Sequence, residues 1–133
     1  MAVSLTGSSS LGRTQEARTS LERAMLQIVA RVQSSRGINS ASGSTLEVAV
    51  SDAGKNPTTI ALSSGAITVK EGAGAADPIT PPTIVITSLT FTKINNPAPS
   101  TSSVRIVATA GYNENGAADP DTLHTLQTTA LPL

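Results

Sequence analysis

The chain has 133 residues, a length that allows one domain and hardly two. Nine Lys and Arg balance nine Asp and Glu, and aromatic residues make up only 2% of the chain, so the basic surface and stacking rings that nucleic-acid binding requires are missing. The sequence contains no cysteine, which excludes disulfides, thiolate metal ligands and a cysteine nucleophile.

A helix is predicted near the start of the chain. Residues 1–13 are rich in Ser and Gly and predict a flexible leader. Beyond them, hydrophobic side chains recur with the period of a helix and define one apolar stripe: Ala17, Leu21, Ala24, Met25, Ile28 and Val32. Arg18, Glu22 and Arg31 lie off this stripe and are expected to face solvent, and Arg18 and Glu22 have the spacing of an attractive ion pair. Gly37 is typical of the position after a helix, so we expect a helix over about residues 14–36.

After Gly37 the hydrophobic period changes to two, which is typical of β-strands. Strands are predicted over residues 45–51, 58–62, 66–70, 84–94, 104–109 and 123–131. Ser63-Ser64-Gly65 predicts a hairpin turn between the second and third strands. The apolar face of the fourth strand changes sides near Thr87, which predicts a bulge or bend.

The segments between these elements are predicted to be turns and loops. Residues 37–44 are expected to be a loop of small side chains. The sequence Gly-Ala-Ala-Asp-Pro occurs at 74–78 and again at 116–120, and both copies are interpreted as turns. Residues 95–100 hold two prolines and predict a further loop. Residues 14–133 are therefore expected to form one α+β domain, with a long N-terminal helix packed on an antiparallel sheet over about 45–131. The sheet residues expected to face the helix are Val48, Leu62, Leu89, Phe91 and Ile106.

The sequence contains no recognisable catalytic pattern. It lacks a G-x-S-x-G nucleophile turn, an H-E-x-x-H zinc motif and a Walker phosphate loop. His124 is the only histidine and falls within the last predicted strand, where we interpret it as structural or exposed. No catalytic or cofactor-binding residue is assigned, and an enzyme is not expected.

One segment contains several side chains with oxygen atoms of the kind that calcium prefers. The weak calcium candidates are Asn113, Glu114, Asn115, Asp119 and Asp121. Their spacing does not match an EF-hand, and Pro120 restricts the backbone. A hydrophilic hairpin loop without metal is the favoured interpretation, and calcium is the alternative. No other cofactor is expected.

Several segments resemble one family. They are the helical ARTSLERAMLQIVARVQ and the strand-like TIALSSGAITVKEG, IVITSLTFTKI, SVRIVATAGY and LHTLQTTALP. Together they resemble the globular half of type IV pilins and pseudopilins, over about residues 14–131. The stretch from Ile86 to Phe91 is close to a "v-t-n-L-t-F" pattern common in minor members of that group.

The resemblance implies a non-catalytic filament subunit, a minor pilin or minor pseudopilin of a type IV pilus or a type II secretion-like filament. Its partners would be other pilin or pseudopilin subunits, contacted through the N-terminal helix. The family's cleavage site and apolar helix half are missing from residues 1–13, so we expect a soluble domain whose membrane anchor has been removed. The resemblance places the complete protein in the bacterial inner membrane, the periplasm and a cell-surface filament.

Two other functions remain open from the sequence. One is an extracellular β-rich, adhesin-like binding module, which predicts a sheet that closes over itself. The other is a small hydrolase, which the absence of a recognisable site disfavours. The sequence does not distinguish a pilus from a secretion pseudopilus, nor a major subunit from a minor one.

Overall fold

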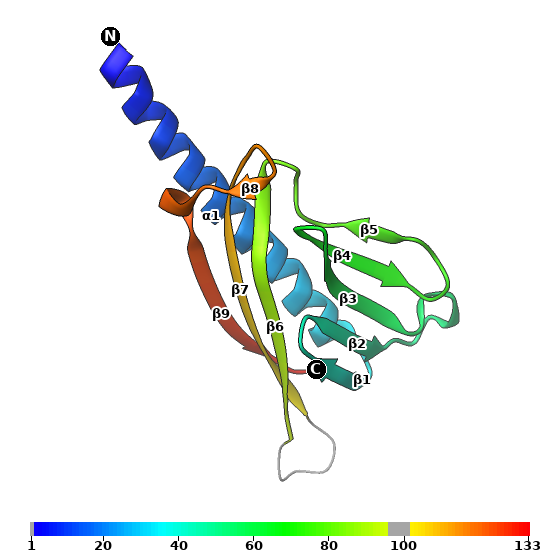
Figure 1. Ribbon diagram of the computed structural model, residues 1–133. Coiled ribbons are helices and arrows are strands. Elements are labelled where there is room, and N and C mark those ends of the chain that lie inside the picture. Colours follow the sequence, from blue (N-terminus) through cyan, green and yellow to red (C-terminus); the bar gives the residue numbers. More distant parts are fainter. Residues whose placement is uncertain (1, 96–101) are drawn as a thin grey trace.

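The computed structural model describes residues 2–95 and 102–133, with side chains from Gly12 onward. The predicted loop at 95–100 therefore lies outside the described residues, apart from Asn95. Within the described ranges, one α-helix precedes two antiparallel sheets (Figure 1). The predicted α+β class is confirmed in this respect.

Helix α1 spans Ala2–Ser34 and is 33 residues long. The six residues of the predicted apolar stripe are at most 5% exposed, which confirms the predicted buried face. The structure differs at the start of the helix, because it continues through the residues predicted to be a leader. Each residue added to an existing helix gains a backbone hydrogen bond, so a helix fixed by packing can extend into a Ser- and Gly-rich stretch.

The first sheet has five antiparallel strands in sequence order: β1 (Gly37–Ser42), β2 (Thr45–Ala49), β3 (Thr58–Ser63), β4 (Ala66–Glu71) and β5 (Ala76–Pro78). β1 occupies the predicted loop, so that prediction was wrong. The predicted hairpin between β3 and β4 is confirmed, with Ser64 and Gly65 at φ +50° and +78° in the turn. Positive φ at both positions gives the twist that a two-residue hairpin needs.

The second sheet consists of β6 (Ile84–Ile94), β7 (Ser103–Glu114), the two-residue β8 (Ala117–Ala118) and β9 (His124–Ala130). β7 is central and pairs antiparallel with β6, β8 and β9. The register between β6 and β7 shifts between Ile86 and Ser88, which confirms the predicted irregularity at Thr87. β5 and β8 show that both Gly-Ala-Ala-Asp-Pro segments contain short strands as well as turns.

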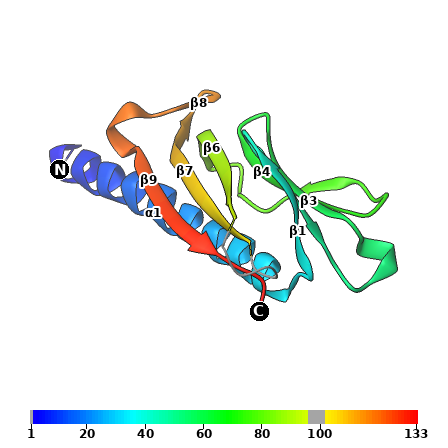
Figure 2. The ribbon, with the colours of Figure 1, turned by 90° about the horizontal axis from the view of Figure 1, so that it is seen from below.

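The core lies between α1 and the two sheets. The second sheet covers one side of α1, and β6 separates β7 from the first sheet in both views (Figures 1 and 2). Val48, Leu89, Phe91 and Ile106, which we expected to face the helix, are at most 4% exposed. Leu62 was predicted to join them but is only partly buried at the edge of the same cluster.

Two hydrogen bonds join the sheets. The N–H of Ile86 donates to the carbonyl oxygen of Gly65 at 2.8 Å, and the N–H of Phe91 donates to that of Gly43, also at 2.8 Å. Gly65 lies in the β3–β4 turn and Gly43 in the β1–β2 turn. The outer edge of β6 is therefore bonded by two hairpin turns of the first sheet.

Candidate functional site

The first three calcium candidates lie in the hairpin between β7 and β8. Asn115, at φ +56°, and Gly116 form its two-residue turn. The Oδ1 atom of Asn113 accepts the N–H of Gly116 at 2.9 Å, and its Nδ2 atom donates to the carbonyl oxygen of Pro82 at 2.9 Å. Glu114 is exposed. The amide of Asn113 is thus used to hold the turn.

The other two candidates lie at the short 3-10 helix η2 (Pro120–Thr122) between β8 and β9: Asp119 is its N-cap residue and Asp121 lies within it. The Oδ1 atom of Asp119 accepts the N–H of Asp121 at 3.0 Å, and its Oδ2 atom lies 3.8 Å from Nη1 of Arg13. The guanidinium of Arg13 also stacks over the ring of Tyr112, 5.4 Å from its centroid. Asp119 therefore caps η2 and links it to α1.

The five weak calcium candidates are divided between two turns. The structure places Asn113 and Asn115 in one turn and Asp119 and Asp121 in another. In the described part of the chain, no three Asp, Glu or His side chains gather closely enough to hold a metal ion. The oxygens of Asn113 and Asp119 are already engaged with backbone N–H groups and with Arg13.

We expect calcium and chelators to leave stability nearly unchanged, because these oxygens already have protein partners. Thermal unfolding in millimolar calcium and in excess EDTA should give the same melting temperature. A rise of several degrees in calcium, lost in Asp119→Ala, would contradict this expectation, because ligand binding to the folded state raises its stability.

His124 lies on β9 opposite Ala110. Its Nε2 atom is buried, and among the described residues it has no hydrogen-bond partner. A catalytic histidine needs a nucleophile or a carboxylate within hydrogen-bond reach. The structure brings neither group to Nε2.

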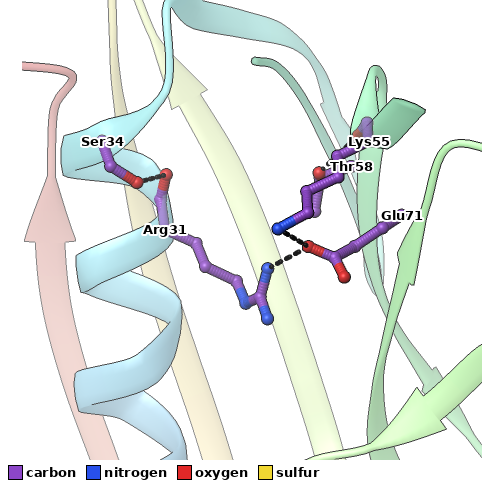
Figure 3. Close-up of polar contacts among 5 residues, drawn as sticks. All are labelled: Arg31, Ser34, Lys55, Thr58 and Glu71. Atoms are coloured by element: carbon purple, nitrogen blue, oxygen red, sulfur yellow. Dashed lines mark hydrogen bonds and ion pairs between the residues drawn. The ribbon is translucent and has the colours of Figure 1, made fainter. Parts of the chain in front are cut away.

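A groove of about 310 Å³ lies where the C-terminal end of α1 meets the first sheet. It is lined by Arg31, Ser34, Val48, Val50, Ser51, Asp52, Lys55, Thr58 and Glu71. Figure 3 shows Arg31 reaching from α1 toward the Oε2 atom of Glu71, at 3.3 Å, with Nζ of Lys55 at 3.9 Å from the same oxygen. One carboxylate is thus shared by two cations.

Two of the hydroxyl groups in this groove are engaged with the backbone. Ser34 donates to the carbonyl oxygen of Arg31 at 3.3 Å, and Thr58 donates to that of Lys55 at 2.8 Å (Figure 3). Asp52 accepts the N–H of Gly54 at 2.9 Å. Both hydroxyls thus donate to carbonyl oxygens, which are not bases that could activate them. The arrangement therefore connects the helix to the sheet and has no evident chemistry of its own.

Sequence reasoning did not find this groove. Arg31 was placed on the solvated side of the helix, and its partner Glu71 lies 40 residues further along the chain. Local spacing contains no signal for such a pair, because the contact exists only once β4 has packed beside α1.

Glu71→Gln should lower the free energy of unfolding by less than about 1 kcal/mol, since Glu71 and Arg31 are both more than a third exposed. The loss should shrink as salt is added. Urea unfolding at low and high ionic strength measures both effects, with Glu22→Gln, which breaks the exposed pair with Arg18, as the matched control. A loss above about 2 kcal/mol would instead mark the ion pair as a principal support of the fold.

Comparisons of the chain with protein-family models, with curated proteins and with solved structures find no match. Among the residues that the structure describes, no helix combines the length and the apolar character needed to cross a membrane.

Proposed function

We propose that this chain is a non-catalytic structural subunit of the type IV pilin and pseudopilin class, acting in a pilus or a type II secretion-like filament. α1 would contact other subunits, and the complete protein would reach the membrane through an apolar helix. A minor subunit is favoured, following the sequence resemblance. No nucleic-acid partner is proposed, given the neutral charge of the chain.

The observation that carries the proposal is the relation of α1 to the sheets. Its docked face is fully buried from Ala17 to Val32, whereas Arg18, Glu22 and Leu26 on other faces are exposed. In Figure 1 the N-terminal turns of α1 project beyond both sheets. A helix that is anchored to its own domain on one side and open on the other has surface left for neighbouring subunits.

The described part of the chain does not favour the adhesin-like alternative. That alternative predicts a sheet that closes over itself. The sheets instead end on β1 and β5 and on β6 and β9, each of which pairs with a strand on one side only. No contact among the described residues favours the hydrolase alternative.

Two experiments test the filament proposal. The first is the sequence directly upstream in the native gene, where we expect a basic leader, a Gly-Phe-type junction and about 20 apolar residues. A native product that begins near residue 13, with no apolar helix before it, would contradict the proposal.

The second experiment follows the protein in its host. An epitope-tagged copy of the complete protein should appear in the fraction of filaments sheared from the cell surface, or in pseudopili when these are overproduced. Deleting the gene should reduce filament number or the secretion that depends on them. Normal filaments and normal secretion in the deletion strain, with the tagged protein absent from both fractions, would count against a filament subunit.

A further inference from the structure

The edges of the two sheets are not equally protected. An open strand edge offers free N–H and C=O groups to another chain, and proteins usually shield it by shortness, bulges, charge or proline. β1 has an irregular register between Ile38 and Ser40, and β5 has three residues and ends in Pro78. The edge of β6 is bonded by the turn carbonyls of Gly43 and Gly65. Three of the four edge strands are thus protected against pairing with another chain.

β9 has none of these protections. It is seven residues long, contains no charged residue and no proline, and pairs with β7 in unbroken register from His124 to Ala130. No strand among the described residues pairs with its outer side. In Figures 1 and 2 it is the outermost strand of the second sheet.

The alternation of hydrogen bonds along the ladder identifies which β9 residues point their backbone N–H and C=O groups toward the open edge. The N–H groups of Ile86 and Phe91 bond to the first sheet and therefore point away from β7. In an antiparallel pair whose backbone groups do not bond to each other, both residues point their N–H and C=O groups away from the partner strand. The β7 residues opposite them, Ala110 and Ile106, therefore direct their N–H and C=O groups toward β9. Ala110 pairs with His124, which therefore bonds to β7.

The same holds for every second residue of β9. Ile106 pairs with Thr128, so Thr128 also directs its N–H and C=O groups inward. The intervening residues Thr125, Gln127 and Thr129 direct theirs toward the open side.

A groove of about 290 Å³ follows this edge where β9 meets α1. It is lined by Glu22, Met25, Leu26, Val29, Leu126, Gln127 and Thr128. Leu26 is 68% exposed. The single charged side chain of the lining, Glu22, is paired with Arg18 at 3.0 Å. An apolar, electrically neutral groove thus adjoins an unprotected strand edge.

We propose that β9 receives an extended strand from a partner protein, uncharged along the contact and apolar at alternate positions. The strand would exchange hydrogen bonds with Thr125, Gln127 and Thr129. Its residues opposite Leu126 and Thr128 would point toward α1 and fill the groove beside Leu26 and Val29. A charged strand would lose hydration there without meeting an opposite charge.

A second copy of this chain fits the edge less well. Antiparallel pairing of β9 with itself about Gln127 would place Thr128 of one copy opposite Leu126 of the other, and Leu126 opposite Thr128. One of the two positions facing the groove would then hold a threonine in place of a larger apolar side chain. This inference depends on the sheet edge and the groove beside it, and it is independent of the filament proposal.

The probe for the test is a short synthetic peptide of alternating valine and threonine, with lysines at both ends for solubility. Titrated into the ¹⁵N-labelled protein, it should shift the amide resonances of Thr125, Gln127 and Thr129 and slow their hydrogen exchange. The amides of Leu126 and Thr128, already bonded to β7, should change much less. The same peptide with a central proline should not bind, since it cannot continue a ladder.

Two variants locate the contact. Gln127→Pro removes one outward N–H and leaves the β7 ladder intact, so it should weaken binding about tenfold, near the upper range for one hydrogen bond. Leu26→Glu places a charge in the groove and should weaken binding by a similar factor, whereas Gln27→Glu adds the same charge to α1 outside this groove and should not.

Three results would overturn the inference: no peptide binding to the unmodified protein, equal shifts along all of β9, or binding unaffected by Leu26→Glu. The protein alone, studied over a concentration series, supplies a fourth. If dilution changes the amides of Thr125, Gln127 and Thr129 without peptide, a second copy occupies the edge and the proposed partner is wrong.

Discussion

Ile28→Asp should unfold the domain or lower its stability by more than about 4 kcal/mol. Ile28 is 0% exposed in the middle of the apolar stripe of α1. The substitution removes a buried aliphatic side chain and places a carboxylate where it has neither water nor a counter-charge. Circular dichroism and thermal unfolding measure the effect as a loss of helical signal or a large fall in melting temperature.

Leu26→Asp is the matched control for this prediction. It introduces the same charge two residues earlier on the same helix, at a side chain that is 68% exposed. Its melting temperature should stay close to that of the unmodified protein. Similar, small effects of both substitutions would mean that α1 is not docked against the sheets as the structure describes.

Gly72→Ala should destabilise the protein by about 3 kcal/mol. Gly72 has a φ of +57°, in the region that L side chains rarely adopt. A Cβ atom there would also overlap the carbonyl oxygen of Gly54 and lie 3.2 Å from its carbonyl carbon. Both obstacles are backbone atoms that no rotamer change can move aside, so the loop after β4 must shift.

Gly43→Ala separates the two causes of this loss. Gly43 has nearly the same φ, +56°, but nothing lies within 4 Å of the position that a Cβ would take. It should lose only the conformational cost, about 1 kcal/mol. Chemical denaturation of both variants gives the difference, which measures the steric overlap with Gly54. Equal losses would contradict the close approach of the two loops.

Much of the regular structure could be predicted because it depends on local patterns. The stripe from Ala17 to Val32 has the period of a helix, and its residues are buried as expected. The turn at Ser64 and Gly65 was predicted because glycine accepts positive φ. The irregularity at Thr87 followed from a change in which alternate positions are apolar. Each signal lies within a few residues of the feature that it predicts.

The division into two sheets could not be predicted in this way. β1 has the sequence GINSAS, with a single large apolar side chain, Ile38, so no alternation marks it as a strand. It forms because β2 offers a partner edge. β5 and β8, with three and two residues, likewise depend on β4 and β7. These three short strands form because they pair with a neighbouring strand, and their own residues do not predict them.

The candidate sites show the same limit. The calcium candidates are close in sequence, but the turn at Asn115 and the 3-10 helix at Asp119 use their oxygens separately. The groove at Arg31 and Glu71, and the groove at Leu26 and Leu126, join residues that only packing brings together. Side chains from distant elements leave no pattern in the sequence.

The bonds from β6 to two hairpin turns also determine where the domain can be engineered. Any insertion in the turns of Gly43 or Gly65 would displace a carbonyl that holds the second sheet to the first. The carbonyl oxygens of the turn at Asn115 and Gly116 accept neither of the two hydrogen bonds that join the sheets, and nothing lies within 4 Å of a Cβ built at Gly116. A reporter sequence can therefore be inserted at this third turn while the two sheets stay joined.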